Sequence, residues 1–201
     1  MADTGAPHFI PFADPTDLVR DWPALSEDVA DAVAAGLTAA GGLVEIKYAA
    51  KTDAQTFNLG TGAFASVDGL SIAHAVSNAS NDVILLANLS GKNGQAGVAH
   101  RGGLAVFAGG TIVEAPDSPG SRFATMSFSG QGDDGGTFAT VNMSVIARHT
   151  PGTTDSVTYD VRVGNGNSGT ITWYVNRTRD DDNIITRARG VSTLILMEVK
   201  V

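Results

Sequence analysis

Residues 157–163 read Val-Thr-Tyr-Asp-Val-Arg-Val, so that every odd position is apolar and every even position is polar. Residues 139–145, Ala-Thr-Val-Asn-Met-Ser-Val, alternate in the same way. Successive side chains of a β-strand point to opposite faces, so a period of two places all the apolar groups on one face. Both segments are therefore predicted to be strands with one buried face and one face in water, which is typical of antiparallel sheets.

Similar segments follow one another from Leu43 to the end of the chain, separated by clusters of glycine, asparagine and aspartate. We predict strands at residues 43–49, 66–76, 83–90, 97–107, 111–114, 122–128, 137–148, 157–163, 170–176 and 191–199. Many short strands with polar turns are typical of a two-layer fold. The expected fold class is therefore mainly β, an antiparallel, jelly-roll-like β-sandwich over residues 43–201.

Two of these segments differ from the rest because they are apolar on both faces. They read Val-Ile-Leu-Leu at residues 83–86 and Leu-Ile-Leu-Met at residues 194–197. In a two-layer protein both faces of a strand can be buried only if it is a central strand or if it contacts another subunit. We therefore predict an oligomer interface at these segments, with the candidate residues Val83, Leu85, Leu194 and Leu196.

The first 42 residues show helical signals instead of alternation. Asp14 is a candidate N-cap, and Pro15 follows it at the first helical position of a short helix. Pro23 begins a second, alanine-rich helix that ends at Gly41-Gly42. The second helix carries a narrow apolar stripe that includes Leu25, Val29 and Val33. We expect residues 1–42 to form a helical leader whose stripe packs on its own domain, on copies of itself or on another protein.

The charge of the chain is concentrated in this leader. The 201 residues include 13 Lys+Arg and 21 Asp+Glu, for a net charge of −8, and residues 1–42 hold seven acidic residues against Arg20. The basic residues are scattered, so nucleic acid is not an expected partner. No secretory signal pattern and no 18-residue apolar run occur, so we expect synthesis in the cytoplasm without export by a signal peptide and without membrane insertion.

Few patterns in the sequence indicate chemistry. The chain has no cysteine, which excludes disulfides, thiolate nucleophiles and cysteine-built metal sites. Residues 164–169 match GxGxxG, but an alternating segment follows them instead of a helix, so a hairpin loop is expected rather than a nucleotide site. The four histidines form no metal-binding or catalytic motif. We therefore predict no catalytic residues and no cofactor, and expect the protein not to be an enzyme.

Two small groups of residues remain as candidate binding sites. Asp180, Asp181 and Asp182 offer oxygen ligands for calcium, but adjacent aspartates in a turn are usually only solvated and their spacing is not that of an EF-hand, so we predict no metal site and keep them as weak candidates. Trp173 and Tyr174 are adjacent on a predicted strand and therefore point to opposite faces. One ring is expected to pack in the core, and the other, if exposed, could stack on a sugar ring.

The two ends of the chain resemble a known family. Residues 10–25, IPFADPTDLVRDWPAL, resemble the leader of minor tail proteins of bacteriophages that infect actinobacteria, with Trp22 where tyrosine is commoner. Residues 189–199, RGVSTLILMEV, are similar to the closing strand of β-domains that end many phage tail and fibre proteins. The resemblance implies a virion structural protein, a homotrimer that attaches to other virion proteins through its leader and contacts a host-surface glycan or receptor through its β-domain.

Other functions fit the same residues. A capsid-mounted head fibre or decoration protein would share the leader and the β-domain, and a soluble carbohydrate-binding module would share the β-domain alone. A fibre-borne depolymerase would require paired carboxylates across a cleft, and no such pair can be named from the sequence.

Overall fold

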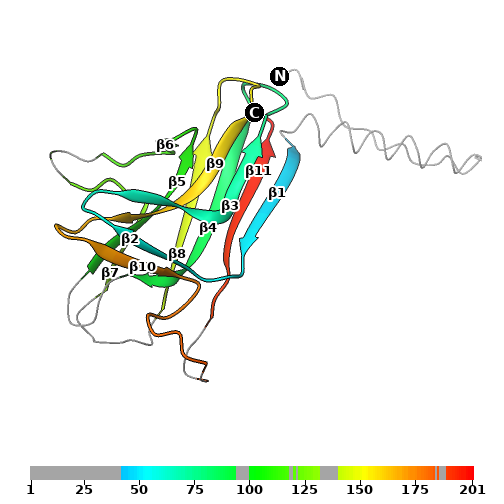
Figure 1. Cartoon of the computed structure of the whole chain (residues 1–201). Helices are drawn as coiled ribbons and strands as arrows, with labels where there is room; N and C mark the ends of the chain where they lie inside the picture. Colours follow the sequence, from blue (N-terminus) through cyan, green and yellow to red (C-terminus); the bar gives the residue numbers. More distant parts are fainter. Residues whose placement is uncertain are drawn as a thin grey trace, which may run out of the picture.

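The computed structural model describes residues 42–93, 100–117, 120, 122–131, 140–183, 185 and 189–201. This part of the chain contains eleven strands and no helix (Figure 1). The strands are β1 (Leu43–Lys51), β2 (Gln55–Leu59), β3 (Phe64–His74), β4 (Asp82–Asn93), β5 (His100–Ala108), β6 (Thr111–Ile112), β7 (Ser127–Gln131), β8 (Val141–His149), β9 (Val157–Asn165), β10 (Ile171–Val175) and β11 (Ser192–Val199). The predicted leader, with Leu25, Val29 and Val33, lies outside the described residues.

The strands form two antiparallel sheets that pack against each other as a β-sandwich, as predicted. Sheet A has six strands, five of them in the order β1-β11-β4-β10-β2. β11 and β10 pair with successive parts of one edge of β4, and β8 pairs with its opposite edge. Sheet B has five strands in the order β3-β9-β5-β6, with β7 also paired to β5. One hydrophobic core lies between the sheets and takes its side chains from both of them.

The strand pairs are nested along the chain. β1 pairs with β11, β2 with β10, β3 with β9, β4 with β8 and β5 with β7, while the short strand β6 lies at the turn. The chain therefore folds like one long antiparallel hairpin that is rolled up, so that β4 also meets β11 and β5 also meets β9. The rolling brings the start and the end of the described chain side by side in sheet A.

The alternation of residues 157–163 is confirmed in β9. Tyr159, Val161 and Val163 are fully buried between the sheets, and Asp160 and Arg162 on the outer side form an ion pair with 2.6 Å between Nε and Oδ2. In β8, Met143, Val145 and Ala147 are buried in the same way. The polar members of the pattern are therefore the residues on the outer faces of the two sheets.

Most predicted strands are found, with three differences. β2 was not predicted, because Gln-Thr-Phe-Asn-Leu contains few apolar residues and lies among turn residues. The strand predicted at 122–128 begins only at Ser127, because the preceding residues cross the outer side of sheet B. The loop at 164–169 is not a hairpin, since it leads from β9 in sheet B to β10 in sheet A. Among the described residues, no helix is long and apolar enough to cross a membrane.

A close backbone contact within sheet A makes a glycine necessary at one position. A Cβ atom at Gly91 in β4 would lie 2.5 Å from the carbonyl oxygen of Tyr174 in β10. Because that oxygen belongs to the backbone, Gly91→Ala is expected to lower the free energy of unfolding by about 1–3 kcal/mol, the usual cost of overpacking. Urea unfolding would measure the change. Gly60→Ala is the matched control, since no atom lies within 4 Å of its added methyl group, and equal losses in the two variants would contradict the prediction.

Candidate functional site

The strands β4 and β11 carry apolar side chains on both faces of sheet A. The predicted interface residues Val83, Leu85, Leu194 and Leu196 are fully buried in the core between the sheets. The prediction that these four side chains form an oligomer interface is therefore corrected, because the pleat of the strands points them into the core. The outward side chains of the same segments are Ile84, Leu86, Ile195 and Met197, and all four are partly exposed.

The register of the strands arranges the outward side chains in two rows across sheet A. Tyr48 of β1 stands opposite Ile195 of β11, Ile195 opposite Leu86 of β4, and Leu86 opposite Ile146 of β8. The neighbouring row follows the same four strands and ends in a charged residue, in the order Ile46, Met197, Ile84, Arg148. We call the seven apolar residues of these rows the apolar face.

The apolar face is open to solvent at both edges of the sheet. Ile46 and Tyr48 on one edge are 56% and 62% exposed, and Ile146 on the other edge is 72% exposed. Arg148, the charged residue at the end of the second row, lies 3.6 Å from Asp82. Contiguous exposed apolar patches on a folded domain mark surfaces that contact other molecules. The apolar face is therefore our candidate functional site.

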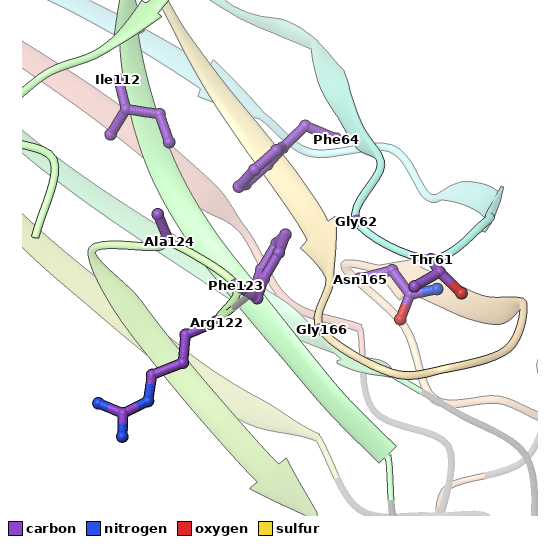
Figure 2. A pocket seen from close by; sticks show the side chains of 9 residues that line it. All are labelled: Thr61, Gly62, Phe64, Ile112, Arg122, Phe123, Ala124, Asn165 and Gly166. Carbon is purple, nitrogen blue, oxygen red and sulfur yellow. The ribbon is translucent and has the colours of Figure 1, made fainter. Parts of the chain in front are cut away.

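A second feature is a hollow of about 370 Å³ on the outer side of sheet B (Figure 2). The rings of Phe64 and Phe123 stack in it with their centroids 4.9 Å apart, and Ile112 extends the apolar wall. Gly164 lies beneath both rings, where a Cβ atom would come within 2.7 Å of each. Thr61 and Arg122 add polar groups to the lining. An aromatic hollow with a polar rim is suited to stacking on a small ring such as a sugar.

The aromatic pair named as a possible glycan contact has one ring in the core and one on the outer face. Trp173 is fully buried, and its indole Nε1 donates a hydrogen bond to the carbonyl oxygen of Gly164 at 3.0 Å. It therefore offers no surface to a ligand, and its role is in the core. Tyr174 points to the opposite face, as the alternation predicted, and is half-buried with the guanidinium of Arg177 5.0 Å from its ring centroid.

The three aspartates that were weak candidates for calcium ligands lie in a loop that contains several arginines. Asp181 contacts two guanidinium groups, those of Arg177 at 3.4 Å and Arg189 at 2.6 Å. Asp180 contacts Arg179 at 3.2 Å. Carboxylates that are neutralised by arginine are poor candidates for a calcium site, because the guanidinium groups already occupy the positions of the cation.

The comparisons with known proteins add no family to these observations. No family model matches the chain, and no curated protein matches it.

Proposed function

We propose that the chain is a structural protein of a bacteriophage virion, a homotrimeric minor tail or fibre protein whose β-sandwich takes part in attachment to the host surface. The observation that carries the assembly part of this proposal is the apolar face, which crosses four strands of sheet A from Tyr48 to Ile146. The occupant that we infer for it is another copy of the same chain. The chain is acidic overall, the seven residues of this face are uncharged, and Asp82 at its border lies 3.6 Å from Arg148, so copies can meet there with little repulsion.

The topology supports a virion protein. The nested pairing of β1 with β11, β3 with β9, β4 with β8 and β5 with β7 is the arrangement that we assign to a jelly roll, in which a long hairpin is rolled into two sheets. Jelly rolls occur in viral capsid proteins and in lectin domains. The resemblance of residues 10–25 to the leader of actinobacteriophage minor tail proteins points to the same class. A capsid-mounted head fibre or decoration protein is the alternative within it.

The mass of the purified full-length chain in solution tests the assembly. Size-exclusion chromatography with light scattering at micromolar concentration should give three times the 20.6 kDa of one chain. A monomer at that concentration would contradict the trimer. Particles produced with a chain that lacks residues 1–42 test the virion role, because the truncated chain should fail to join them.

The hollow on sheet B favours a second candidate function, that of a carbohydrate-binding module. The stacked rings of Phe64 and Phe123 provide the apolar surface that sugar rings pack against. Titration with fragments of a bacterial envelope polysaccharide, followed by NMR, should shift resonances around this hollow. Phe123→Ala should weaken that binding at least tenfold, and equal binding by the variant would place the contact elsewhere.

A further inference from the structure

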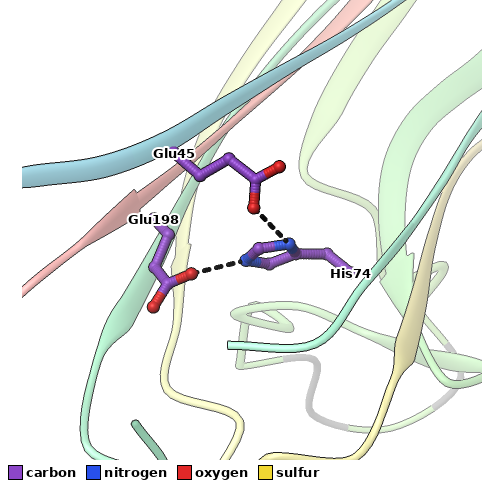
Figure 3. A group of neighbouring side chains, drawn as sticks. All are labelled: Glu45, His74 and Glu198. Carbon is purple, nitrogen blue, oxygen red and sulfur yellow. Dashed lines mark hydrogen bonds and ion pairs between the residues drawn. The ribbon is translucent and has the colours of Figure 1, made fainter. Parts of the chain in front are cut away.

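Three side chains that are far apart in the sequence meet at one end of the sandwich (Figure 3). Glu45 of β1 and Glu198 of β11 are neighbours in the register of sheet A. His74, the last residue of β3 in sheet B, lies between the two carboxylates. His74 and Glu198 are almost completely buried, whereas the side chain of Glu45 is 47% exposed. The cluster therefore lies at the boundary between the core and solvent.

The carboxylate of Glu198 determines how the imidazole is oriented. Its Oε1 accepts hydrogen bonds from the backbone N and Oγ of Ser77, at 2.8 and 2.6 Å, and from Nδ2 of Asn81 at 2.6 Å. Its Oε2 lies 2.9 Å from Nε2 of His74. Because an ionised carboxylate only accepts hydrogen bonds, Nε2 must carry the proton in this contact. In the neutral ring the lone pair is then on Nδ1.

That lone pair faces a second carboxylate. Nδ1 of His74 is fully buried and has no hydrogen-bond partner among the described residues. Oε2 of Glu45 lies 3.6 Å from it, which is too far for a hydrogen bond. A lone pair opposite an anionic oxygen is unfavourable unless a cation lies between them. Lys47 does not supply that cation, because its Nζ lies 3.6 Å from the other oxygen of Glu45, Oε1, and 3.4 Å from the carbonyl oxygen of Ala73.

We propose that Nδ1 of His74 and Oε2 of Glu45 bind one divalent transition-metal ion, zinc in the first place. Zinc binds histidine nitrogen and carboxylate oxygen at roughly 2.0–2.2 Å, so two ligand atoms 3.6 Å apart subtend an angle at the metal of about 120°, close to tetrahedral. Glu198 is the carboxylate that holds the other ring nitrogen, an arrangement that fixes the tautomer of a metal-binding histidine. Water on the side of Glu45, whose side chain is 47% exposed, would complete the coordination.

Such an ion would connect the two layers of the sandwich. Glu45 belongs to sheet A and His74 to sheet B, so the metal bridges β1 and β3 in addition to the hydrogen bond from Nζ of Lys47 to the carbonyl oxygen of Ala73. The ion binds the folded chain and should therefore raise its resistance to unfolding. The proposed virion function does not require this site.

Calorimetric titration of zinc chloride into the full-length chain at pH 7.5 tests the proposal. The wild type should bind one more equivalent of zinc than Glu45→Gln, which keeps the shape of the side chain on an exposed edge. Asp155→Asn, an exposed carboxylate outside the cluster, is the matched control and should bind zinc like the wild type. His74→Gln, whose amide can still donate to Glu198, should lose the same equivalent as Glu45→Gln.

NMR of the imidazole nitrogens provides a second measurement that does not depend on total stoichiometry. Addition of zinc should shift Nδ1 of His74 in the wild type and leave it unchanged in Glu45→Gln. If Nδ1 instead carries a proton at pH 7.5 and zinc does not shift it, the cation between the two groups is the proton and the metal site is refuted. Equal zinc binding by the wild type and Glu45→Gln would also refute it.

Discussion

Ile146→Lys is expected to convert the assembled protein into monomers without changing the stability of the folded monomer. Ile146 is 72% exposed on β8, so the fold itself gains little from its side chain. Burial of an isoleucine at a contact contributes about 1.5–3 kcal/mol, and an unpaired ammonium group in the same place costs still more. Association should therefore weaken at least about 100-fold, since each 1.4 kcal/mol corresponds to a factor of ten. Light scattering over a dilution series measures this change.

Asn142→Lys is the matched control for this variant. Asn142 lies on the same strand and the same face of sheet A as Ile146, but outside the apolar face, and it is already exposed and polar. The variant adds the same charge, so it separates the loss of apolar contact from a general effect of charge. It should remain assembled, and at concentrations low enough for the wild type to be monomeric both variants should unfold at the same urea concentration as the wild type. If Ile146→Lys assembles like the wild type, the apolar face is not the contact between copies.

The apolar face shows how far alternation alone leads. The sequence predicted that residues 83–86 and 194–197 were apolar on both faces, and this is what the structure shows. It could not indicate which alternate residues point inward, because every position in these segments is apolar and either set of side chains could face the core. The neighbouring strand β8 decides between the two sets. Asn142 and Ser144 of β8 are exposed, and their parity identifies Leu86 and Ile146 as outward residues.

The order of the strands in the sheets could not be predicted from the sequence, for a different reason. Alternation identifies a strand and its two faces, but hydrogen bonds between strands involve only the backbone, which is the same for every residue. The nested pairs join residues as far apart as Leu43 and Val199. The hollow on sheet B was not predicted for a related reason. Phe123 contacts Gly164 because the segment before β7 crosses the outer side of the sheet, and no pattern in the sequence indicates that path.

The cluster at the end of the sandwich depends on the same long-range pairing. His74 and Glu198 are separated by 124 positions, so no motif could indicate that they meet. The only signals in the sequence were charged residues, Glu45 and Glu198, in strands that are otherwise largely apolar. A buried glutamate requires several hydrogen-bond donors. Ser77 and Asn81, in the connection between β3 and β4, supply them.

Glu198→Gln is accordingly expected to lower the free energy of unfolding by about 3 kcal/mol, because each buried donor that is left without an acceptor costs roughly 1–3 kcal/mol. In the wild type, hydrogen-bond donors approach both carboxylate oxygens of Glu198, whereas a glutamine amide has only one oxygen. Its NH₂ group must therefore face some of these donors. Urea unfolding in the presence of a chelator measures the loss without a contribution from metal. Glu114→Gln makes the same chemical change at an exposed position and should cost almost nothing.

The pH dependence of this loss separates the carboxylate from other effects of the substitution. Burial raises the pKa of Glu198, but the hydrogen bonds from Ser77, Asn81 and His74 outweigh burial, so the pKa lies below its ordinary value of 4.5. A carboxyl group whose pKa is lower in the folded chain binds fewer protons there than in the unfolded chain, so its contribution to stability is complete well above pH 4.5. That contribution is lost as the pH falls through the lowered pKa. The difference in stability between the wild type and Glu198→Gln should therefore be constant near neutral pH and shrink in acid. A difference that stays constant into acid would show that the charge of Glu198 does not stabilise the fold.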